Sequence, residues 1–226
     1  MTQIEATYID HMGSDLSVVN AARVSFGKRS ECEEIRWLDM GSWCGDQPVV
    51  SQRDAKLIRY LAKHKHLSPF GHAFASFHIK APIFVARQLV KHKFLRWNEI
   101  SRRYVSDVPE FYVPTLRGTT PDKKQGSGDT LYESAAADNA IRTAHTQARS
   151  NYNLLLRSDV CEEQARMVLP QSTITEWYWS GSLDAFAAMC KLRCASDTQY
   201  ETRVVADNIS EKMQEIFPVA WGALTE

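Results

Sequence analysis

The most restrictive feature of this 226-residue sequence is a run of strict alternation at residues 72–80, HAFASFHIK. One set of alternate positions holds only alanine, phenylalanine and isoleucine, as in a strand that buries one face. Pro82 follows, and proline suits a first helical turn because its missing N–H would have no partner there. We therefore predict a strand over 72–80 that leads directly into a helix over 83–94.

Other segments carry apolar residues at helical spacing or are broken by glycine and proline. Helices are predicted at 15–26, at 52–64, at 130–157, at a short segment ending at Pro170, at 183–193 and at 198–216. Strand or extended structure is predicted at 98–105, 110–114 and 173–181, and loops at 27–50 and 118–129. Because helices outnumber strands and do not alternate regularly with them, the predicted fold class is α+β.

Two of the predicted helices begin with residues that favour helix starts. Asp15 and Ser17 stand in the first turn of helix 15–26, and Ser182 immediately precedes helix 183–193. Side-chain oxygens of these residue types accept hydrogen bonds from the free N–H groups of a first turn. We expect each of them to cap its own helix.

Composition places few limits on partners. Lysine plus arginine equal aspartate plus glutamate, 27 each, so any anion site must come from local clustering of charge. The length suits one larger domain, residues 1–226. The sequence has no signal-peptide pattern and no apolar run of about 18 residues, so we expect a cytoplasmic protein without membrane contact.

The five cysteines include no C-x-x-C pair. Their odd number argues against a complete disulfide framework and favours a reducing compartment. Cys190 and Cys194 are four residues apart, but no histidine lies nearby in the sequence to complete a zinc site. We predict no bound metal.

Residues 87–104, RQLVKHKFLRWNEISRRY, hold six arginines or lysines in eighteen positions. This density in a neutral protein favours an anion site. Gln88 and Asn98 carry amides that can contact carbonyl and imide groups, and Trp97 and Tyr104 offer flat rings for stacking. These groups suit a nucleotide, although composition alone leaves open a solvated basic helix end.

The order of these residues resembles the signature of the flavin-dependent thymidylate synthases, Arg-His-Arg, seven residues, then Ser. Here it stands as Lys91-His92-Lys93, seven residues, then Ser101. Flanking segments match the family in the same order along nearly the whole chain: DLSVVNAARVSF, HLSPFGH, HIKAPIFVARQ, EFYVP, ARMVLP and LRCASDTQYE. The resemblance implies helices packed on a small, mainly antiparallel sheet.

The resemblance also implies residue roles. The positions that contact deoxyuridine monophosphate (dUMP) in the family are Gln88, Lys91, Glu99, Ser101, Arg102, Arg103, Arg166 and Arg193. The positions that hold flavin adenine dinucleotide (FAD) are His66, Ser68, Lys91, His92, Lys93, Glu99 and Ser182. Arg193 is the implied catalytic residue, because a guanidinium at the N3 and O4 edge of uracil stabilises the charge that makes C5 nucleophilic.

The implied reaction transfers a one-carbon unit from methylene-tetrahydrofolate to C5 of dUMP, giving dTMP, with FAD as cofactor and NADPH as reductant. The family's architecture further implies a homotetramer with sites between subunits and no nucleic-acid partner. Two alternatives remain open. One is a relative that makes the hydroxymethyl product, and the other is a non-catalytic descendant that binds nucleotide or RNA through residues 87–104.

Several positions depart from the family pattern. Lysine replaces arginine at 91 and 93, which keeps the charge but loses the rigid two-pronged donor. Arg102 stands where glycine is common, and Ser182 and Ala188 stand where asparagines often contact the flavin. Segment 27–50 is also longer than the family pattern suggests.

Overall fold

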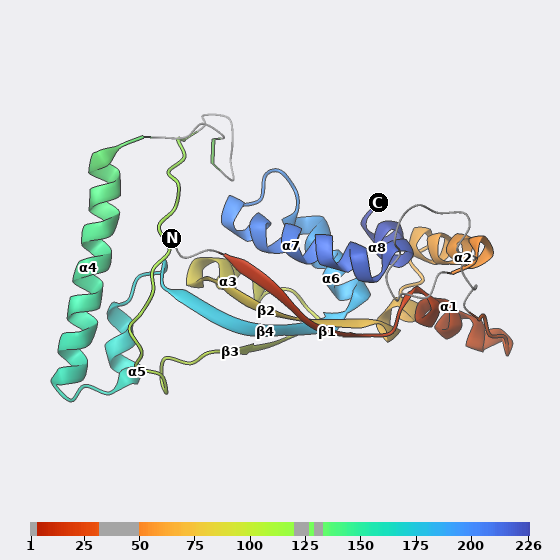
Figure 1. The fold of residues 1–226 in the computed structure, drawn as a ribbon, viewed down its shortest axis with the longest axis horizontal. Helices are drawn as coiled ribbons and strands as arrows, with labels where there is room; N and C mark the ends of the chain where they lie inside the picture. The colour runs from red at the N-terminus through yellow and green to blue at the C-terminus, as the bar shows by residue number, and fades with distance from the viewer. Residues whose placement is uncertain (1–3, 32–49, 120–126, 129–132) are drawn as a thin grey trace, which may run out of the picture.

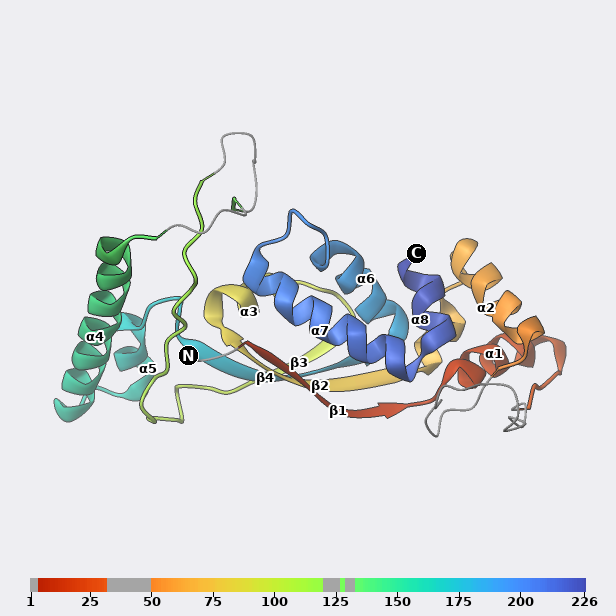
Figure 2. The ribbon, with the colours of Figure 1, turned by 45° about the horizontal axis from the view of Figure 1, so that its top comes forward.

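The computed structural model describes residues 4–31, 50–119, 127–128 and 133–226. Most of the loops predicted at 27–50 and 118–129, and the predicted helix start at Thr130, lie outside these residues. The chain forms an elongated α+β structure in which helices cover one face of an antiparallel sheet, while another helix stands beyond the sheet's end (Figures 1 and 2). The predicted fold class is confirmed.

The sheet has the order β1-β2-β4-β3, and every neighbouring pair is antiparallel. Its strands are β1 (Glu5–Met12), β2 (Phe74–Pro82), β3 (Leu95–Glu99) and β4 (Ile174–Ser182). The segments predicted as strands at 72–80 and 173–181 thus form the central pair, β2 and β4, with Phe77 opposite Trp179. Segment 110–114 is extended as predicted, and Phe111 bridges Thr173 just before β4.

The helices are α1 (Asp15–Arg23), α2 (Gln52–Lys63), α3 (Ile83–Leu89), α4 (Ala135–Arg157), α5 (Glu162–Ala165), α6 (Leu183–Arg193), α7 (Tyr200–Ile216) and α8 (Pro218–Thr225). Short 3-10 turns occur at η1 (Val24–Phe26), η2 (Ser68–His72) and η3 (Arg166–Val168). Among the described residues, no helix has the length and the apolar run needed to span a membrane.

The predictions for residues 83–105 require correction. The helix ends at Leu89 instead of continuing to 94, and the extended strand is Leu95–Glu99 instead of 98–105. The chain turns at Phe94, whose positive φ of 67° no helix accommodates. It then runs antiparallel beside β4, so close that a Cβ added to Gly181 would overlap the Leu95 side chain. This packing between distant segments overrides the local helical pattern.

The capping prediction is confirmed for Ser17, whose Oγ accepts from Ser14 N at 3.0 Å at the start of α1, but it requires correction for Ser182 and Asp15. Ser182 stands at the start of α6, but its side chain makes no capping hydrogen bond. Asp15 does not cap its own helix: its buried carboxylate accepts hydrogen bonds from Val219 N and Ala220 N, both 2.9 Å, in the first turn of α8. Burial raises the pKa of Asp15 despite these two bonds. Helix α8 itself was missed, and Asp15 ties it to the N-terminal part of the chain.

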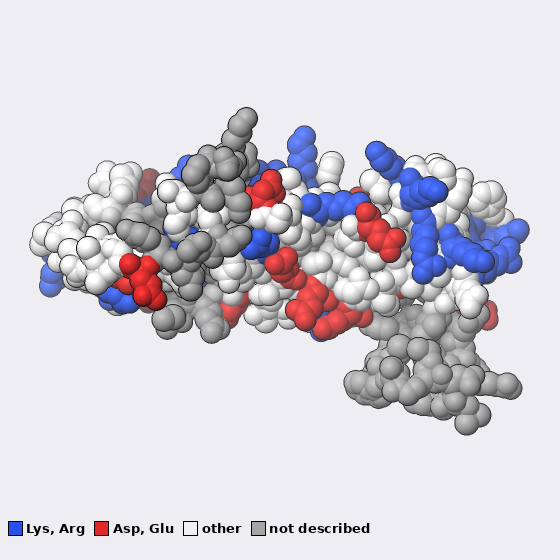
Figure 3. Space-filling model, turned by 90° about the horizontal axis from the view of Figure 1, so that it is seen from above, with Lys and Arg blue, Asp and Glu red and all other residues white. Residues whose placement is uncertain are grey.

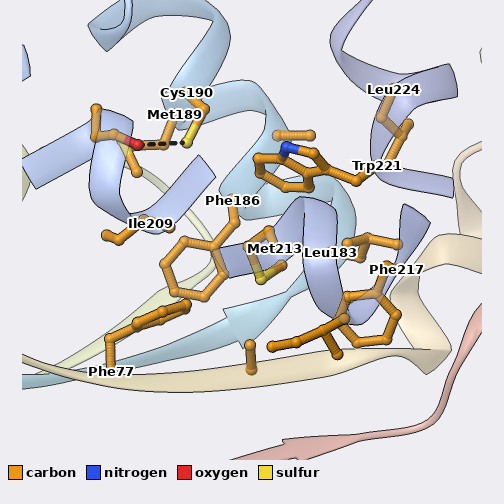
Figure 4. Packing of buried hydrophobic residues seen from close by; sticks show 14 of the residues in the cluster. Phe77, Leu183, Phe186, Met189, Cys190, Ile209, Met213, Phe217, Trp221 and Leu224 are labelled. Atoms are coloured by element: carbon orange, nitrogen blue, oxygen red, sulfur yellow. Dashed lines mark hydrogen bonds between the residues drawn. The ribbon is translucent and has the colours of Figure 1, made fainter. Parts of the chain in front are cut away.

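The main core lies between the sheet and helices α6, α7 and α8 (Figure 4). Phe186 of α6 packs edge-on against Phe77 of β2 and Trp179 of β4, with ring centroids 5.5 and 5.6 Å apart. Ile209 and Met213 of α7 close the same cluster, and all of these side chains are buried. The core thereby fixes the ends of α6 and α7 over the sheet, where several predicted site residues lie.

Candidate functional site

Arg193, in the last turn of α6, contacts two elements that are far away in sequence. Its Nε donates to His92 Nε2 at 3.0 Å, and its Nη2 lies 3.4 Å from the backbone oxygen of Gln88. His92 follows α3, and Gln88 lies within it. The structure therefore brings together the predicted catalytic arginine, one predicted substrate residue and one predicted cofactor residue, and we call these three residues the Arg193 cluster.

The hydrogen bond from Arg193 requires His92 Nε2 to be unprotonated. Burial, and then the adjacent Arg193 charge, lower the pKa of His92 below its ordinary value. At neutral pH the imidazole is thus an uncharged acceptor that holds the guanidinium in place. Lys91 and Lys93 on either side are exposed.

A second group forms around Glu163 of α5, and we call it the Glu163 cluster. Arg103 Nε donates to the Glu163 carboxylate at 3.1 Å, and Arg166 Nε donates to its backbone oxygen at 3.3 Å. Ser101 Oγ accepts from Arg103 N at 3.3 Å. Three residues predicted to bind the nucleotide thus lie together, with two guanidinium groups at one place, which suits a phosphate.

Two further predicted substrate residues, Glu99 and Arg102, form hydrogen bonds with partners outside both clusters. The Glu99 carboxylate accepts from Thr175 Oγ1 at 2.6 Å and from Trp97 Nε1 at 3.1 Å, so both its oxygens are held. Arg102 Nη1 instead donates to the backbone oxygen of Asp107 at 2.9 Å, within its own loop. Within the described part of the chain, no hydrogen bond or ion pair joins the Glu163 cluster to the Arg193 cluster.

Two predicted cofactor residues, His66 and Ser68, line a cavity of about 750 Å³ between α1, α2 and η2, which we call the α2 pocket. The His66 ring stacks on Tyr60 with centroids 6.3 Å apart. Arg23 also lines the pocket but is paired with Asp54. Burial acts to raise the pKa of Asp54, but hydrogen bonds from Arg23 and two serines outweigh it and lower that pKa. The exposed cations of the pocket are Lys28, Arg53 and Lys56.

Figure 3 shows basic side chains gathered at the end of the molecule that carries α1 and α2. The pocket at this end therefore combines positive charge with flat rings, a donor set suited to a nucleotide carrying phosphates. The sequence predicts the pocket residues His66 and Ser68. It does not predict three of the pocket residues of α2, which lie near them because α2 packs beside η2: Arg53, Lys56 and Tyr60. All three are exposed residues of a helix, and nothing in their spacing along the sequence indicates a binding site.

Ser182 is buried at the start of α6 and belongs to none of these groups. Ala188, four residues before Leu192 on the same helix, is exposed and offers no polar atom. Among the described residues, no three histidine, cysteine or acidic side chains converge as a metal site would require.

The pKa of His92 leads to a prediction about pH. For the dUMP binding that the family resemblance implies, we expect an affinity that is constant between about pH 7 and 8 and falls as the pH drops below about 6.5, because protonated His92 cannot accept the Arg193 hydrogen bond. The nucleotide phosphate also titrates near pH 6. The measurement is therefore calorimetric titration of wild type and His92→Asn in parallel. Equal acid losses in the two proteins would show that His92 does not cause the effect.

Comparisons with known proteins agree with the resemblance seen in the sequence. The family model described as "Thymidylate synthase complementing protein" matches residues 7–219. A flavin-dependent thymidylate synthase of Thermus thermophilus is 40% identical over 220 residues, which cover 96% of this chain and 74% of that protein. The enzyme of the same name from Ehrlichia ruminantium is 36% identical, with coverage of 96% and 69%.

A solved structure is similar over the full fold. The UMP/dUMP methylase PolB from Streptomyces cacaoi, bound with 5-Br dUMP, superposes with a TM-score of 0.79 at 30% identity. The superposition covers 99% of this chain and 95% of that one. A second structure of the same methylase, bound with 5-Br UMP, gives a TM-score of 0.77.

Proposed function

The chain belongs to the flavin-dependent thymidylate synthases, and from this premise we propose that it transfers a one-carbon unit from methylene-tetrahydrofolate to C5 of dUMP, giving dTMP. The observation that carries the proposal is the contact of Arg193 with His92 and Gln88. Its two hydrogen bonds, to the His92 ring and to the Gln88 backbone oxygen, hold the guanidinium in one orientation, which supports a role beside a pyrimidine edge that gains negative charge.

The Glu163 cluster would hold the phosphate of dUMP. A phosphate can accept hydrogen bonds from two guanidinium groups at once. It would take the place of Glu163 as the hydrogen-bond acceptor of Arg103 and Arg166. Because no contact among the described residues joins this cluster to Arg193, we propose that a second copy of the chain contributes one of the two groups. In line with the resemblance to the family, we propose a homotetramer with sites between subunits.

The α2 pocket and the turn at Lys91-His92-Lys93 would hold FAD. The aromatic rings of the pocket suit the flat ring systems of a flavin dinucleotide, and its exposed cations and the Ser68 hydroxyl suit the pyrophosphate. Bound FAD would supply the hydride that brings the transferred carbon to the methyl level, with NADPH as the source of electrons. The chain's own residues bind and orient the nucleotide and stabilise its developing charge.

The described cysteines do not suit a mechanism in which a thiolate adds to the uracil ring. Cys190 is buried, its Sγ donates to the Ala206 backbone oxygen at 3.6 Å (Figure 4), and the neighbouring Cys194 together with burial raises its pKa. Cys194 lies beside it and Cys161 is exposed on the surface. This supports chemistry in which no enzyme nucleophile attacks the pyrimidine.

Mass spectrometry of the nucleotide product tests the proposed function. With FAD, NADPH and methylene-tetrahydrofolate, we expect dUMP to gain one methylene group, with one NADPH consumed per product. A product heavier by a further oxygen, formed without stoichiometric NADPH consumption, would establish the hydroxymethyl reaction instead. No product from dUMP would refute the proposal, and a parallel reaction with UMP would show whether the ribonucleotide is the substrate.

A further inference from the structure

A side-chain contact between α3 and the start of α7 lies next to the Arg193 cluster. Gln88 Nε2 donates to Gln199 Oε1 at 2.5 Å. Gln199 is the residue from which α7 begins, and Gln88 is the residue whose backbone oxygen faces Arg193. The side chains of both glutamines are partly buried, so the contact lies at the edge of the proposed site.

This contact decides which end of the Gln88 amide is available. A glutamine side chain has a donor end and an acceptor end, and exchange of the two reverses what it recognises. Because the Gln88 NH₂ group gives one of its N–H bonds to Gln199, the contact fixes the orientation of the amide, and the carbonyl oxygen is the acceptor left for a ligand. The site then combines one neutral acceptor, Gln88 Oε1, with the cationic donor Arg193.

An acceptor beside a cationic donor complements uracil and not cytosine. The imide edge of uracil has an N–H at N3 between two carbonyl oxygens, whereas cytosine has an acceptor at N3 and an amino group at C4. An acceptor facing N3 would therefore pair with uracil and repel cytosine. We propose that Gln199 is a positioning residue that selects uracil over cytosine by fixing the orientation of the Gln88 amide; this inference rests on the proposed function.

The start of α7 is built to hold Gln199 in place. Its backbone oxygen accepts from Thr202 N and Arg203 N, both at 3.0 Å. Two residues along, the buried Glu201 carboxylate accepts from Arg117 Nη2 at 2.7 Å and from the Tyr112 hydroxyl at 3.4 Å. Burial, and then Glu201, raise the pKa of Tyr112 to about 12, so this hydroxyl keeps its proton at neutral pH.

Two substitutions at Gln199 test the proposal. Glu can only accept a hydrogen bond, so Gln199→Glu preserves the partner of the Gln88 NH₂ group, whereas Gln199→Leu removes it. We expect Gln199→Leu to weaken dUMP binding by about three- to tenfold, which corresponds to the loss of one hydrogen bond. The ratio of the dCMP dissociation constant to the dUMP dissociation constant should be lower in Gln199→Leu than in wild type. In Gln199→Glu the same ratio should lie close to the wild-type value.

The experiment is calorimetric titration of the full chain loaded with FAD, with dUMP and dCMP as the two probes. Gln214→Leu is the matched control, because Gln214 is an exposed glutamine of α7 whose amide donates to the Pro218 backbone oxygen at 2.9 Å. The base selectivity of this variant should stay that of wild type. Damage to the fold would weaken the binding of dUMP and dCMP equally and leave the ratio of their dissociation constants unchanged. A change in that ratio therefore distinguishes a positioning role from a loss of stability.

The outcomes are distinct. If wild type binds dUMP and the leucine variant keeps its selectivity, the positioning role of Gln199 is refuted while the proposed function stands. If the glutamate variant loses more selectivity than the leucine variant, the Gln88 amide has the opposite orientation and the inference is also overturned. If wild type binds neither nucleotide, the proposed function itself fails.

Discussion

Replacing Arg193 by alanine is expected to slow release of tritium from C5-labelled dUMP by about 10²–10³-fold, the usual loss when one donor to a developing negative charge is removed. The guanidinium is partly exposed at the end of α6, so its removal leaves the core between α6, α7 and the sheet intact. Thermal unfolding of the variant should therefore be close to that of wild type. Arg193→Lys should recover only part of the rate, since lysine lacks the two-pronged donor.

The matched control is Arg157→Ala. Arg157 is also an arginine in the last turn of a helix, α4, and there it interacts favourably with the helix end. If Arg193 served only as such a terminal charge, both alanine variants would release tritium at similar rates. Near-normal release by Arg193→Ala would remove this residue from the proposed catalytic role.

The sequence predicts best the strands that bury one face, because the burial of every second residue sets their hydrophobic pattern. Burial alternates along β2 from Phe74 to Ala81 and along β4 from Thr175 to Gly181, and both strands lie at the centre of the sheet. Strand β1 was missed because its register shifts between Tyr8 and Asp10, which breaks the alternation, and because it lies at the sheet's edge. Strand β3 was misplaced because its five residues lie within a basic segment that has little periodicity.

The candidate site is predictable only in part, for a different reason. Arg193 and His92 are 101 residues apart, and spacing along the chain does not reveal their contact. Their roles, catalysis for Arg193 and FAD binding for His92, are implied by the resemblance to a family. Gln199, which precedes α7, and Glu163 of α5 are not among the predicted site residues. Such contacts depend on how α3, α5, α6 and α7 are placed by the sheet, which is a property of the whole fold.

Replacing Arg117 by methionine is expected to lower the free energy of unfolding by about 3–5 kcal/mol, because it leaves a buried carboxylate without its cation. The Glu201 side chain is 2% exposed, and one of its oxygens already has no hydrogen-bond partner among the described residues. Arg117 also lies over the Tyr200 ring at 4.9 Å and so ties segment 111–119 to α7. Urea unfolding followed by circular dichroism measures the loss.

Two further variants separate the buried pair from ordinary ion pairs. Arg103→Met breaks a pair whose side chains are 49% and 58% exposed, and it should cost no more than about 1 kcal/mol. The double variant Arg117→Met, Glu201→Met removes both charges, and it should recover much of the stability lost in Arg117→Met, since the main cost is the uncompensated carboxylate. If the double variant is instead less stable than Arg117→Met by the full cost of a second deletion, the two residues stabilise the fold independently, and the ion pair does not fix the start of α7.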